Sequence, residues 1–205
     1  MGSTAVIRKL AAFVSTERDV VAFQLTAPFF QPWTSPEFEK DQWSVETLPL
    51  LTDTAFLPAG LGALLSTRRR TETCHVLKIK DEIVGWGFSA CPVDAIWPID
   101  ETGTVLRMLP YSLCLTGFET RSDRRLRGIY KTLLTHILDD FFVRSEGTAY
   151  ICSVSTNVPS LASIRRLGFA EKEVHRLRRR FGFVTRTIDD VRGYAGGRPE
   201  AGAAA

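Results

Sequence analysis

The feature that most constrains this chain is a short basic segment, residues 125–130, set between an apolar stretch and a long amphipathic one. The stretch before it, residues 111–119 (YSLCLTGFE), has the apolar and aromatic composition of a β-strand. In the stretch after it, residues 129–142, apolar side chains recur at helical spacing on one face. These side chains are Ile129, Leu133, Leu134, Ile137, Leu138, Phe141 and Phe142. The sequence therefore predicts a strand that turns through a glycine-containing loop into a helix.

The loop before this predicted helix has the properties of an anion site. The first N–H groups of a helix have no internal partner, and the helix dipole is positive at that end. Gly128 lacks the Cβ that would keep a phosphate away from the backbone, and Arg124, Arg125, Arg127 and Lys131 add positive charge. We interpret the loop as a cradle for a phosphate group, in particular a pyrophosphate. A solvated helix start with ordinary surface arginines is the alternative.

Two common phosphate motifs are absent, and a third is present. No Gly-Lys-Ser/Thr follows at the spacing of a Walker loop, and the three spaced glycines of a dinucleotide fingerprint are missing. The loop instead resembles the acyl-CoA motif of the GNAT superfamily, the GCN-type N-acetyltransferases, which reads Gln/Arg-x-x-Gly-x-Gly/Ala after the fourth strand. Arg125 matches the first position and Gly128 the fourth, whereas Tyr130 departs at the sixth, where Gly or Ala is usual.

A second GNAT-like signature follows downstream. Residues 149–156 (AYICSVST) predict a fifth strand, and the superfamily pattern then has an Asn, a small residue three positions on, a short helix and a closing Leu-Gly-Phe. The matching residues are Asn157, Ser160, Leu167, Gly168 and Phe169. Pro159 suits a first helical turn, and Gly168 suits a left-handed helix C-cap. The two signatures in this order make the resemblance specific over residues 73–184.

The resemblance implies a fold and a ligand. The fold is a GNAT-like α/β (α+β) domain over residues 1–190, with a mixed, mostly antiparallel central sheet flanked by helices and splayed between strands 4 and 5. The ligand is acetyl-CoA or another acyl-CoA, whose pantetheine arm would pair with strand backbone exposed at the splay. A backbone N–H, that of Phe118, would hold the thioester oxygen. The implied ligand-binding residues are Phe118, Glu119, Thr120, Arg125, Leu126, Arg127, Gly128, Ile129, Tyr130, Lys131, Asn157 and Ser160.

The predicted fourth strand lacks an obvious general base. Strand alternation places Cys114, Thr116 and Phe118 on one face, and many GNAT proteins carry Glu or His at positions matching the first two. Glu119 would point to the opposite face unless a one-residue bulge turned it inward. The candidate catalytic residues are therefore Cys114, Thr116 and Glu119, with Cys114 as a covalent acyl carrier being the more remote hypothesis.

A proton donor for the departing thiolate is also missing from its usual place. Many GNAT proteins carry a Tyr seven residues after the Asn, where this chain has Ile164. Tyr111, Tyr130 and Tyr150 are substitutes, although packing roles are the simpler interpretation. We therefore expect a mechanism based on positioning. It would suit an amine of modest pKa, such as that of an amino sugar, better than a lysine side chain at about 10.4.

Composition narrows the class of protein. The chain has 205 residues, 44% of them hydrophobic, which fits one domain with a substantial core. Its four cysteines form no C-x-x-C pair and its three histidines show no metal spacing, so we expect reduced thiols in a cytoplasmic protein and no metal site. We also expect no membrane span, because no apolar run approaches twenty residues. The tail over residues 191–205 has a disordered composition.

Three functions stay open. The first is an acyl-CoA-dependent N-acetyltransferase acting on a small-molecule amine, for which the resemblance also allows a homodimer. The second is a nucleic-acid- or ribosome-associated binding module, based on the basic runs at residues 68–70, 124–127 and 175–180; the net charge of only +3 makes this weaker. The third is an acyltransferase that takes its acyl group from an acyl carrier protein.

The remaining segments give coarser predictions. At the N-terminal end we predict a strand at residues 6–13, a helix opened by a capping box at residues 16–19, a helix start at 35–36 and a helical piece at 57–65. Aromatic residues over 27–50 either cap the sheet or, as the resemblance implies, lie over the acceptor side of the cleft. Residues 73–89 predict a hairpin around Asp81.

Two further segments complete the chain. Residues 92–104, which include Trp97, Asp100 and Glu101, predict a long loop that could reach the acceptor site. Residues 171–184 predict a final strand or strand pair.

Overall fold

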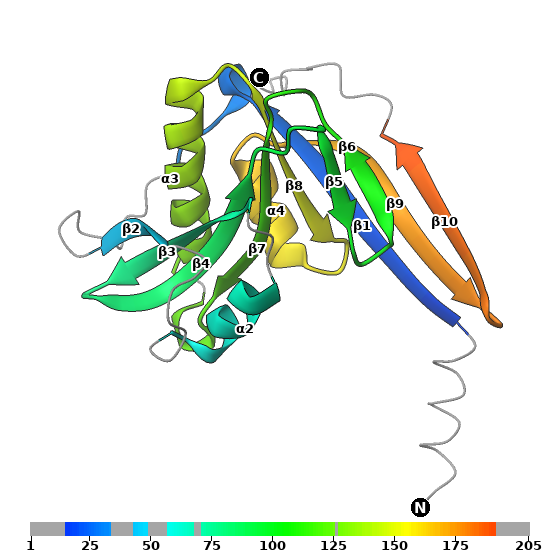
Figure 1. Ribbon diagram of the computed structural model, residues 1–205, viewed down its shortest axis with the longest axis horizontal. Helices are drawn as coiled ribbons and strands as arrows, with labels where there is room; N and C mark the ends of the chain where they lie inside the picture. The colour runs from blue at the N-terminus through cyan, green and yellow to red at the C-terminus, as the bar shows by residue number, and fades with distance from the viewer. Residues whose placement is uncertain (1–14, 34–42, 49–56, 68–70, 126, 192–205) are drawn as a thin grey trace, which may run out of the picture.

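A large mixed β-sheet organises the protein. The computed structural model describes residues 15–33, 43–48, 57–67, 71–125 and 127–191. Eight strands form one sheet in the order β10-β9-β1-β8-β7-β4-β3-β2, and β5 and β6 form a separate hairpin (Figure 1). The sheet strands are β1 (Ser15–Thr26), β2 (Trp43–Leu48), β3 (Thr73–Ile79), β4 (Glu82–Ala90), β7 (Leu113–Thr120), β8 (Thr148–Val154), β9 (Ala170–Arg180) and β10 (Phe183–Asp190). The hairpin strands are β5 (Ile96–Ile99) and β6 (Thr104–Arg107).

Helices cover both faces of this sheet. They are α2 (Ala59–Thr67), α3 (Ile129–Arg144), α4 (Val158–Arg166) and the 3₁₀ turns η1 (Ala27–Phe29) and η3 (Ser122–Arg124). Successive strand residues point to opposite faces. On β3, Val76 therefore packs with Leu61 of α2, whereas Leu77 packs with the cluster that contains Leu133 of α3 and Leu161 of α4. The sheet thus lies between α3 and α4 on one face and α2 on the other.

The β5–β6 hairpin covers the remaining part of the α2 face. Trp97, Ile99 and Leu106 of the hairpin pack with Val20 of β1 and Tyr150 of β8. Residues 92–104 are therefore not a simple loop as predicted, because β5 and a turn account for most of them. The turn at residues 100–103 is held by the Gly103 N–H, which donates to the Ile99 carbonyl at 2.8 Å.

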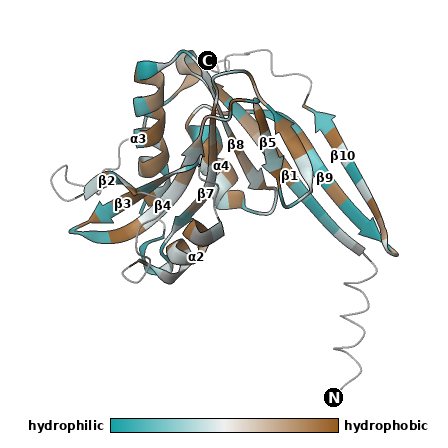
Figure 2. Cartoon of the chain, in the orientation of Figure 1, coloured by the Kyte–Doolittle hydropathy of each residue, from teal (hydrophilic) through white to brown (hydrophobic). Residues whose placement is uncertain are grey.

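The long helix α3 forms as its periodicity predicts. It carries hydrophobic and hydrophilic residues along its length (Figure 2), and its buried side is packed against the sheet. The buried residues are Ile129, Thr132, Leu133, Leu134, Thr135, Ile137 and Leu138. Each fully buried Leu or Ile contributes about 1.5–3 kcal/mol, so this face fixes the position of the helix and of the loop at its start.

The sheet opens between β7 and β8. These two strands are the only parallel pair among the described strands, and they pair over just three positions, Leu113–Leu115 against Ala149–Ile151. Beyond Leu115 the strands diverge, which leaves backbone on both sides of the fork without a ladder partner. The predicted mixed, mostly antiparallel sheet with a splay between these strands is confirmed.

The N-terminal part differs from the sequence prediction. The capping box and helix predicted from residue 16 are wrong, because this segment is β1, paired with β8 on one side and β9 on the other. The polar residues that resembled a cap instead make cross-strand ion pairs, Glu17 with Arg178 and Asp19 with Arg176. The strand predicted at residues 6–13 and the helix start at 35–36 lie outside the described residues. The helical piece predicted at 57–65 is confirmed as α2.

The other strand predictions are confirmed. The β3–β4 hairpin turns at Lys80 and Asp81, which both have positive φ (49° and 66°), as a tight two-residue hairpin turn requires. The C-terminal segment is a strand pair, β9 and β10, and β10 forms one edge of the sheet.

Candidate functional site

A bulge in β7 sets the direction of the side chains at the fork. Trp86 of β4 pairs with Glu119 and Phe88 pairs with Thr116, so one β4 residue stands opposite Gly117 and Phe118. Gly117 has φ of 60°, the left-handed conformation typical of a glycine bulge. The extra residue changes the alternation for the rest of the strand.

The bulge corrects one sequence prediction and supports another. The prediction that Phe118 shares a face with Thr116 is wrong. The Phe118 ring lies on the α3 side of the sheet, over Gly87, and a Cβ on Gly87 would come within 2.4 Å of it. Glu119 instead shares the face of Thr116, the outcome expected if a bulge were present. Its carboxylate lies close to Gly60 of α2, 3.5 Å from where a Cβ on that glycine would stand.

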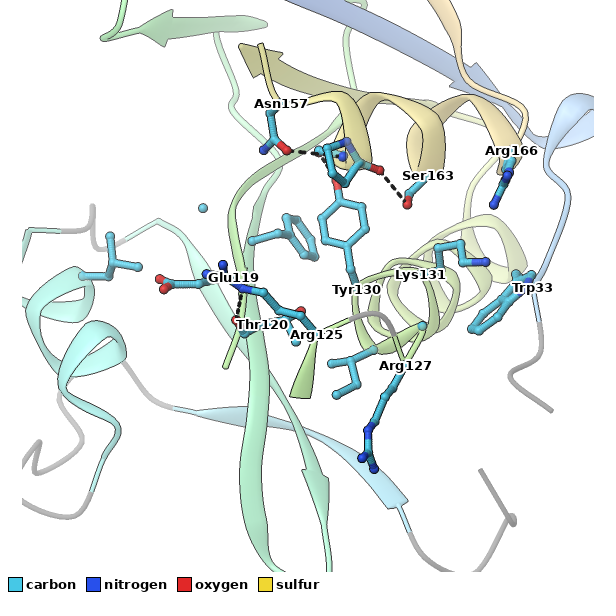
Figure 3. A pocket seen from close by; sticks show the side chains of 17 residues that line it. Trp33, Glu119, Thr120, Arg125, Arg127, Tyr130, Lys131, Asn157, Ser163 and Arg166 are labelled. Atoms are coloured by element: carbon cyan, nitrogen blue, oxygen red, sulfur yellow. Dashed lines mark hydrogen bonds between the residues drawn. The ribbon is translucent and has the colours of Figure 1, made fainter. Parts of the chain in front are cut away.

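A cleft of about 890 Å³ runs from the fork to the start of α3 (Figure 3). Eleven of the twelve residues that the sequence assigns to the ligand line it; the twelfth, Leu126, lies outside the described residues. The eleven are Phe118, Glu119, Thr120, Arg125, Arg127, Gly128, Ile129, Tyr130, Lys131, Asn157 and Ser160. The lining residues that the sequence does not assign are Trp33, Leu64, Gly117, Pro159, Ser163 and Arg166.

The loop at the start of α3 requires glycine at residue 128. Gly128 is the helix N-cap and has φ of 78°. A Cβ there would lie 2.1 Å from Cη2 of Trp33, whose indole packs directly on the glycine. The Lys131 ammonium lies over the same indole, 3.7 Å from the ring centroid. Trp33, one of the aromatic residues over 27–50 for which the sequence allows two roles, therefore forms one wall of the cleft beside the predicted phosphate cradle.

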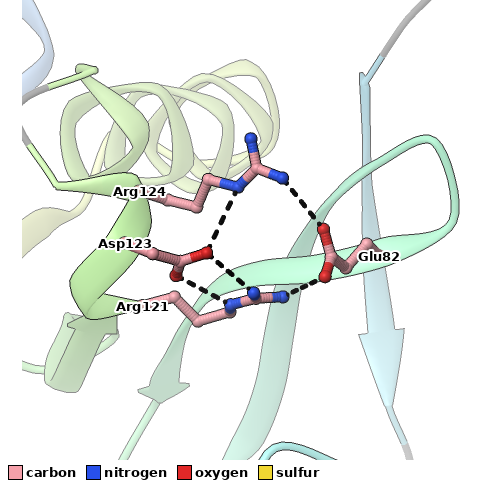
Figure 4. Close-up of polar contacts among 4 residues, drawn as sticks. All are labelled: Glu82, Arg121, Asp123 and Arg124. Atoms are coloured by element: carbon pink, nitrogen blue, oxygen red, sulfur yellow. Dashed lines mark hydrogen bonds and ion pairs between the residues drawn. The ribbon is translucent and has the colours of Figure 1, made fainter.

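Only part of the basic segment faces the cleft. Arg121 and Arg124 are held by Glu82 and Asp123 (Figure 4), with Arg124 lying 3.2 Å from Glu82 and 3.7 Å from Asp123. These ion pairs lower the pKa of the Glu82 carboxyl, chiefly through the bond from Arg121. Arg124 therefore does not add free charge to the cradle, contrary to the sequence prediction.

The cations that line the cleft have no carboxylate partner among the described residues. They are Arg125, Arg127, Lys131 and Arg166. Arg125 donates weakly to the Thr120 carbonyl, at 3.5 Å. Burial and the nearby Arg166 lower the pKa of Lys131. The positive charge at this end of the cleft is therefore not balanced by paired carboxylates among the described residues, and it can attract an anionic ligand.

Tyr130 stands where the cleft meets the fork. Its hydroxyl lies 3.1 Å from Oγ of Ser160, and its ring packs edge-on against Phe118 with the centroids 5.7 Å apart. Burial raises the pKa of Tyr130 to about 12, and the Ser160 hydrogen bond opposes this shift. Ser160 in turn donates its N–H to Oδ1 of Asn157, the N-cap of α4, at 3.4 Å. Asn157 and Ser160, which belong to the downstream sequence signature, therefore hold the phenol of Tyr130, which belongs to the upstream one.

A smaller cavity of about 190 Å³ adjoins the cleft at Tyr130 and lies between the diverging parts of β7 and β8. It shares with the cleft the residues Gly117, Phe118, Tyr130, Asn157 and Ser160. Its other lining residues include Glu101, Thr116 and Cys152. Cys114 of β7 is not among them, because its side chain is buried against the β5–β6 hairpin. Of the three candidate catalytic residues, Thr116 therefore lines the smaller cavity and Glu119 the larger.

Known proteins resemble this chain in structure and not in sequence. No family model matches the sequence, and no curated protein matches it. A GCN5-related N-acetyltransferase from Sphaerobacter thermophilus matches the fold with a TM-score of 0.53 and 15% identity, over 87% of this chain and 57% of that one. A GNAT-family protein from Novosphingobium aromaticivorans matches with a TM-score of 0.52 and 12% identity, over 85% and 66%. A tandem GNAT protein from the clavulanic acid biosynthesis pathway matches with a TM-score of 0.54 and 13% identity, over 89% and 59%.

These matches establish that the chain has the fold of the GNAT acetyltransferases. The chain spans 57–66% of the length of the three structures. Because the identities are low, the activity has to be argued from the site.

Neither a metal centre nor a membrane span is found within the described part of the chain. No three or more His, Cys, Asp or Glu side chains there are grouped so as to hold a metal ion. No helix among those residues is long and apolar enough to cross a membrane.

Proposed function

We propose that this protein is an acyl-CoA-dependent N-acyltransferase that moves an acyl group, in the first instance acetyl, to the amine of a small molecule. The observation that carries the proposal is one continuous cleft. It joins the β7 arm of the open fork, residues 117–120, to a glycine N-cap surrounded by cations that have no carboxylate partner among the described residues. The fork offers unpaired backbone to an extended pantetheine arm, and the cationic end offers backbone N–H groups and arginines to a pyrophosphate.

The chain's own groups would act by position and charge. Arg125, Arg127 and the N–H groups at the start of α3 would hold the phosphates. Backbone N–H groups near the bulge at Gly117 and Phe118 would face the thioester oxygen. Tyr130 stays a neutral phenol through the physiological range because its pKa is about 12. It can therefore donate a hydrogen bond to a departing thiolate without losing its proton.

Replacing Tyr130 with phenylalanine tests this role. We expect Tyr130→Phe to lower kcat by about tenfold or more, because a hydrogen bond to developing charge is lost. Binding of acetyl-CoA should stay within about twofold, since the ring packing against Phe118 is kept. Steady-state kinetics and calorimetry would measure the two effects. Ser160→Ala is the matched control, because it removes the partner of the hydroxyl and leaves the phenol; an equal loss in both variants would show that Tyr130 acts only through Ser160.

Calorimetric titration with acetyl-CoA, followed by a thiol-release assay with a panel of amines, tests the function itself. Micromolar binding and amine-dependent release of CoA are expected. Binding of acyl carrier protein with its phosphopantetheine, and none of acetyl-CoA, would favour the carrier-dependent alternative. Absence of both would contradict the proposal.

The nucleic-acid alternative is weakened by how the basic run on β9 is used. Arg178 lies 2.8 Å from Glu17, and Arg176 is paired with Asp19 and Asp189. Much of that positive charge is neutralised within the sheet, so it does not form an unbroken basic stripe.

A further inference from the structure

Building on the acyltransfer function proposed above, we infer that the smaller cavity is the acceptor site. We infer that Glu101 holds and deprotonates the amine, and that the acceptor is a compact cationic amine without a carboxylate beside it. Glu101 comes from the turn between β5 and β6, an element separate from the strand that carries the candidate bases predicted from the sequence.

The position of the cavity supports this assignment. The cavity lies between the two arms of the fork, lined by residues 115–118 of β7 and 151–154 of β8, and it shares Tyr130, Asn157 and Ser160 with the cleft. An acyl group that enters the fork from the cleft would therefore reach this cavity. Its floor is formed by Leu115 and Ile151, the last positions at which β7 and β8 pair. Its volume of about 190 Å³ is below the range of about 300–1,000 Å³ usual for sites that take a drug-sized ligand. The cavity therefore suits a compact acceptor.

The charge of the cavity wall selects a cation. Glu101 is exposed, and no cation is paired with it among the described residues. The nearby Glu173 is different, because it is bonded to Lys172 at 2.7 Å and to His175 at 3.0 Å. Burial would raise the pKa of Glu173, yet these two partners lower it below its usual value. Glu101 is thus the uncompensated carboxylate at the cavity.

The Cys152 side chain lines the same cavity, and the pKa of its thiol is affected by the same negative charges. Burial, and then the charges of Glu101 and Glu173, raise the pKa of its thiol to about 12. The thiol is therefore protonated at physiological pH and is a poor nucleophile. This leaves direct attack by the amine as the simplest chemistry at the site, in place of a covalent acyl-cysteine.

The turn that carries Glu101 is firmly held. Arg186 of β10 donates to the Thr102 carbonyl at 3.0 Å, and Oγ1 of Thr102 lies 2.7 Å from Oγ1 of Thr104. Thr104 continues this network to Nδ1 of the buried His175, at 2.8 Å. Glu101 is therefore presented by a fixed turn. The titratable and charged groups that face this region from the packed elements are Tyr130, Cys152, Lys172, Glu173, His175 and Arg186.

The proton balance is simple. The ammonium of the acceptor gives one proton to the Glu101 carboxylate, and the neutral nitrogen attacks the thioester carbon. The C–N bond forms, the C–S bond breaks, and its electron pair leaves on sulfur. The nitrogen loses its second proton to solvent, and protonated Glu101 returns its proton to the thiolate. A carboxylate next to the amine would be repelled by Glu101, so amino acids should be poor acceptors.

Matched acceptor pairs and matched variants test the inference. The pairs are isoamylamine with leucine and histamine with histidine, each assayed by thiol release with acetyl-CoA. We expect kcat/KM for the amine to exceed that for the amino acid by about 100-fold in at least one pair, by electrostatic exclusion. Glu101→Gln should lower kcat/KM for that amine by about 100-fold, as expected for loss of a general base. Asp100→Asn is the control, because it removes an adjacent exposed carboxylate that does not line the cavity.

A second readout is independent of turnover. The rate at which iodoacetamide alkylates Cys152, measured by mass spectrometry, should rise in Glu101→Gln. The reason is that one of the charges that raise the pKa of the thiol is removed. Three results would overturn the inference: equal use of amines and amino acids, no amine turnover despite acetyl-CoA binding, or full activity of Glu101→Gln. None of them would contradict the proposed acetyl-CoA site. Failure to bind acetyl-CoA would instead overturn the proposed function.

Discussion

Replacing both Arg125 and Arg127 with glutamate is expected to reduce acetyl-CoA affinity by about 100-fold or more. Both side chains line the cationic end of the cleft, and neither has a carboxylate partner among the described residues. A hydrogen bond to a charged group contributes about 1.5–3 kcal/mol, and about 1.4 kcal/mol corresponds to a tenfold change in affinity. Losing both contacts, and placing negative charge where the positive charge was, therefore accounts for a fall in affinity of at least this size. Calorimetric titration with acetyl-CoA would measure it.

A control of equal charge separates local contacts from the overall field. Arg179→Glu with Arg180→Glu makes the same change in net charge on β9, where both residues are exposed and line neither cavity. This variant should bind acetyl-CoA within about threefold of the wild type at physiological salt, because exposed charges beyond a Debye length of about 8 Å are screened. If the Arg125 and Arg127 variant binds equally well, the cradle is not a phosphate site.

Local patterns in the sequence predict much of the site region. The helix over residues 129–142 has a clear 3.6-residue period, and its tertiary contacts follow from that period. Asn157 and Gly168 mark the two ends of α4 through short-range chemistry, a side-chain cap and a left-handed C-terminal residue. Such features depend on neighbours only a few residues away, so a single sequence is enough to predict them.

Features that depend on distant partners were not predictable in this way. Glu17 and Asp19 imitate a helix cap, and only β9, about 160 residues later, shows that they are strand residues with arginine partners. Arg124 resembles part of the cradle in the sequence, but its partner is Glu82 of β4. The position of Glu101 depends on the packing of the β5–β6 hairpin against β1 and β8, which no local pattern reveals.

The bulge in β7 lies between these two cases. Gly117 is a visible signal, because an isolated glycine in a strand often marks a bulge. Its effect on Phe118 and Glu119 depends on the register with β4, where Gly87 leaves room for the Phe118 ring. The sequence could therefore raise the bulge as an alternative, and only the pairing could decide it.

Substituting Gly168 with alanine is expected to destabilise the protein severely. Gly168 has φ of 94°, and a Cβ there would lie 1.9 Å from the carbonyl oxygen of Phe29. That carbonyl cannot move freely, because the next residues are tied to the end of α4 by the Gln31 N–H, which donates to the Leu167 carbonyl at 3.0 Å. We expect the free energy of unfolding to fall by about 3 kcal/mol or more, a size reserved for steric or strain defects in the core.

Gly182 provides the matched control for this substitution. It has φ of 82°, nearly the same backbone conformation, but no atom lies within 4 Å of the position its Cβ would take. Gly182→Ala should therefore cost only the left-handed strain of about 1–2 kcal/mol. The difference between the two variants in urea unfolding isolates the clash with Phe29. Equal losses would mean that the backbone at Phe29 yields, and the packing of η1 against α4 would then be looser than the contacts imply. Because α4 also positions Asn157 and Ser160, the Gly168 variant should lose acetyl-CoA affinity together with stability, whereas the Gly182 variant should keep it.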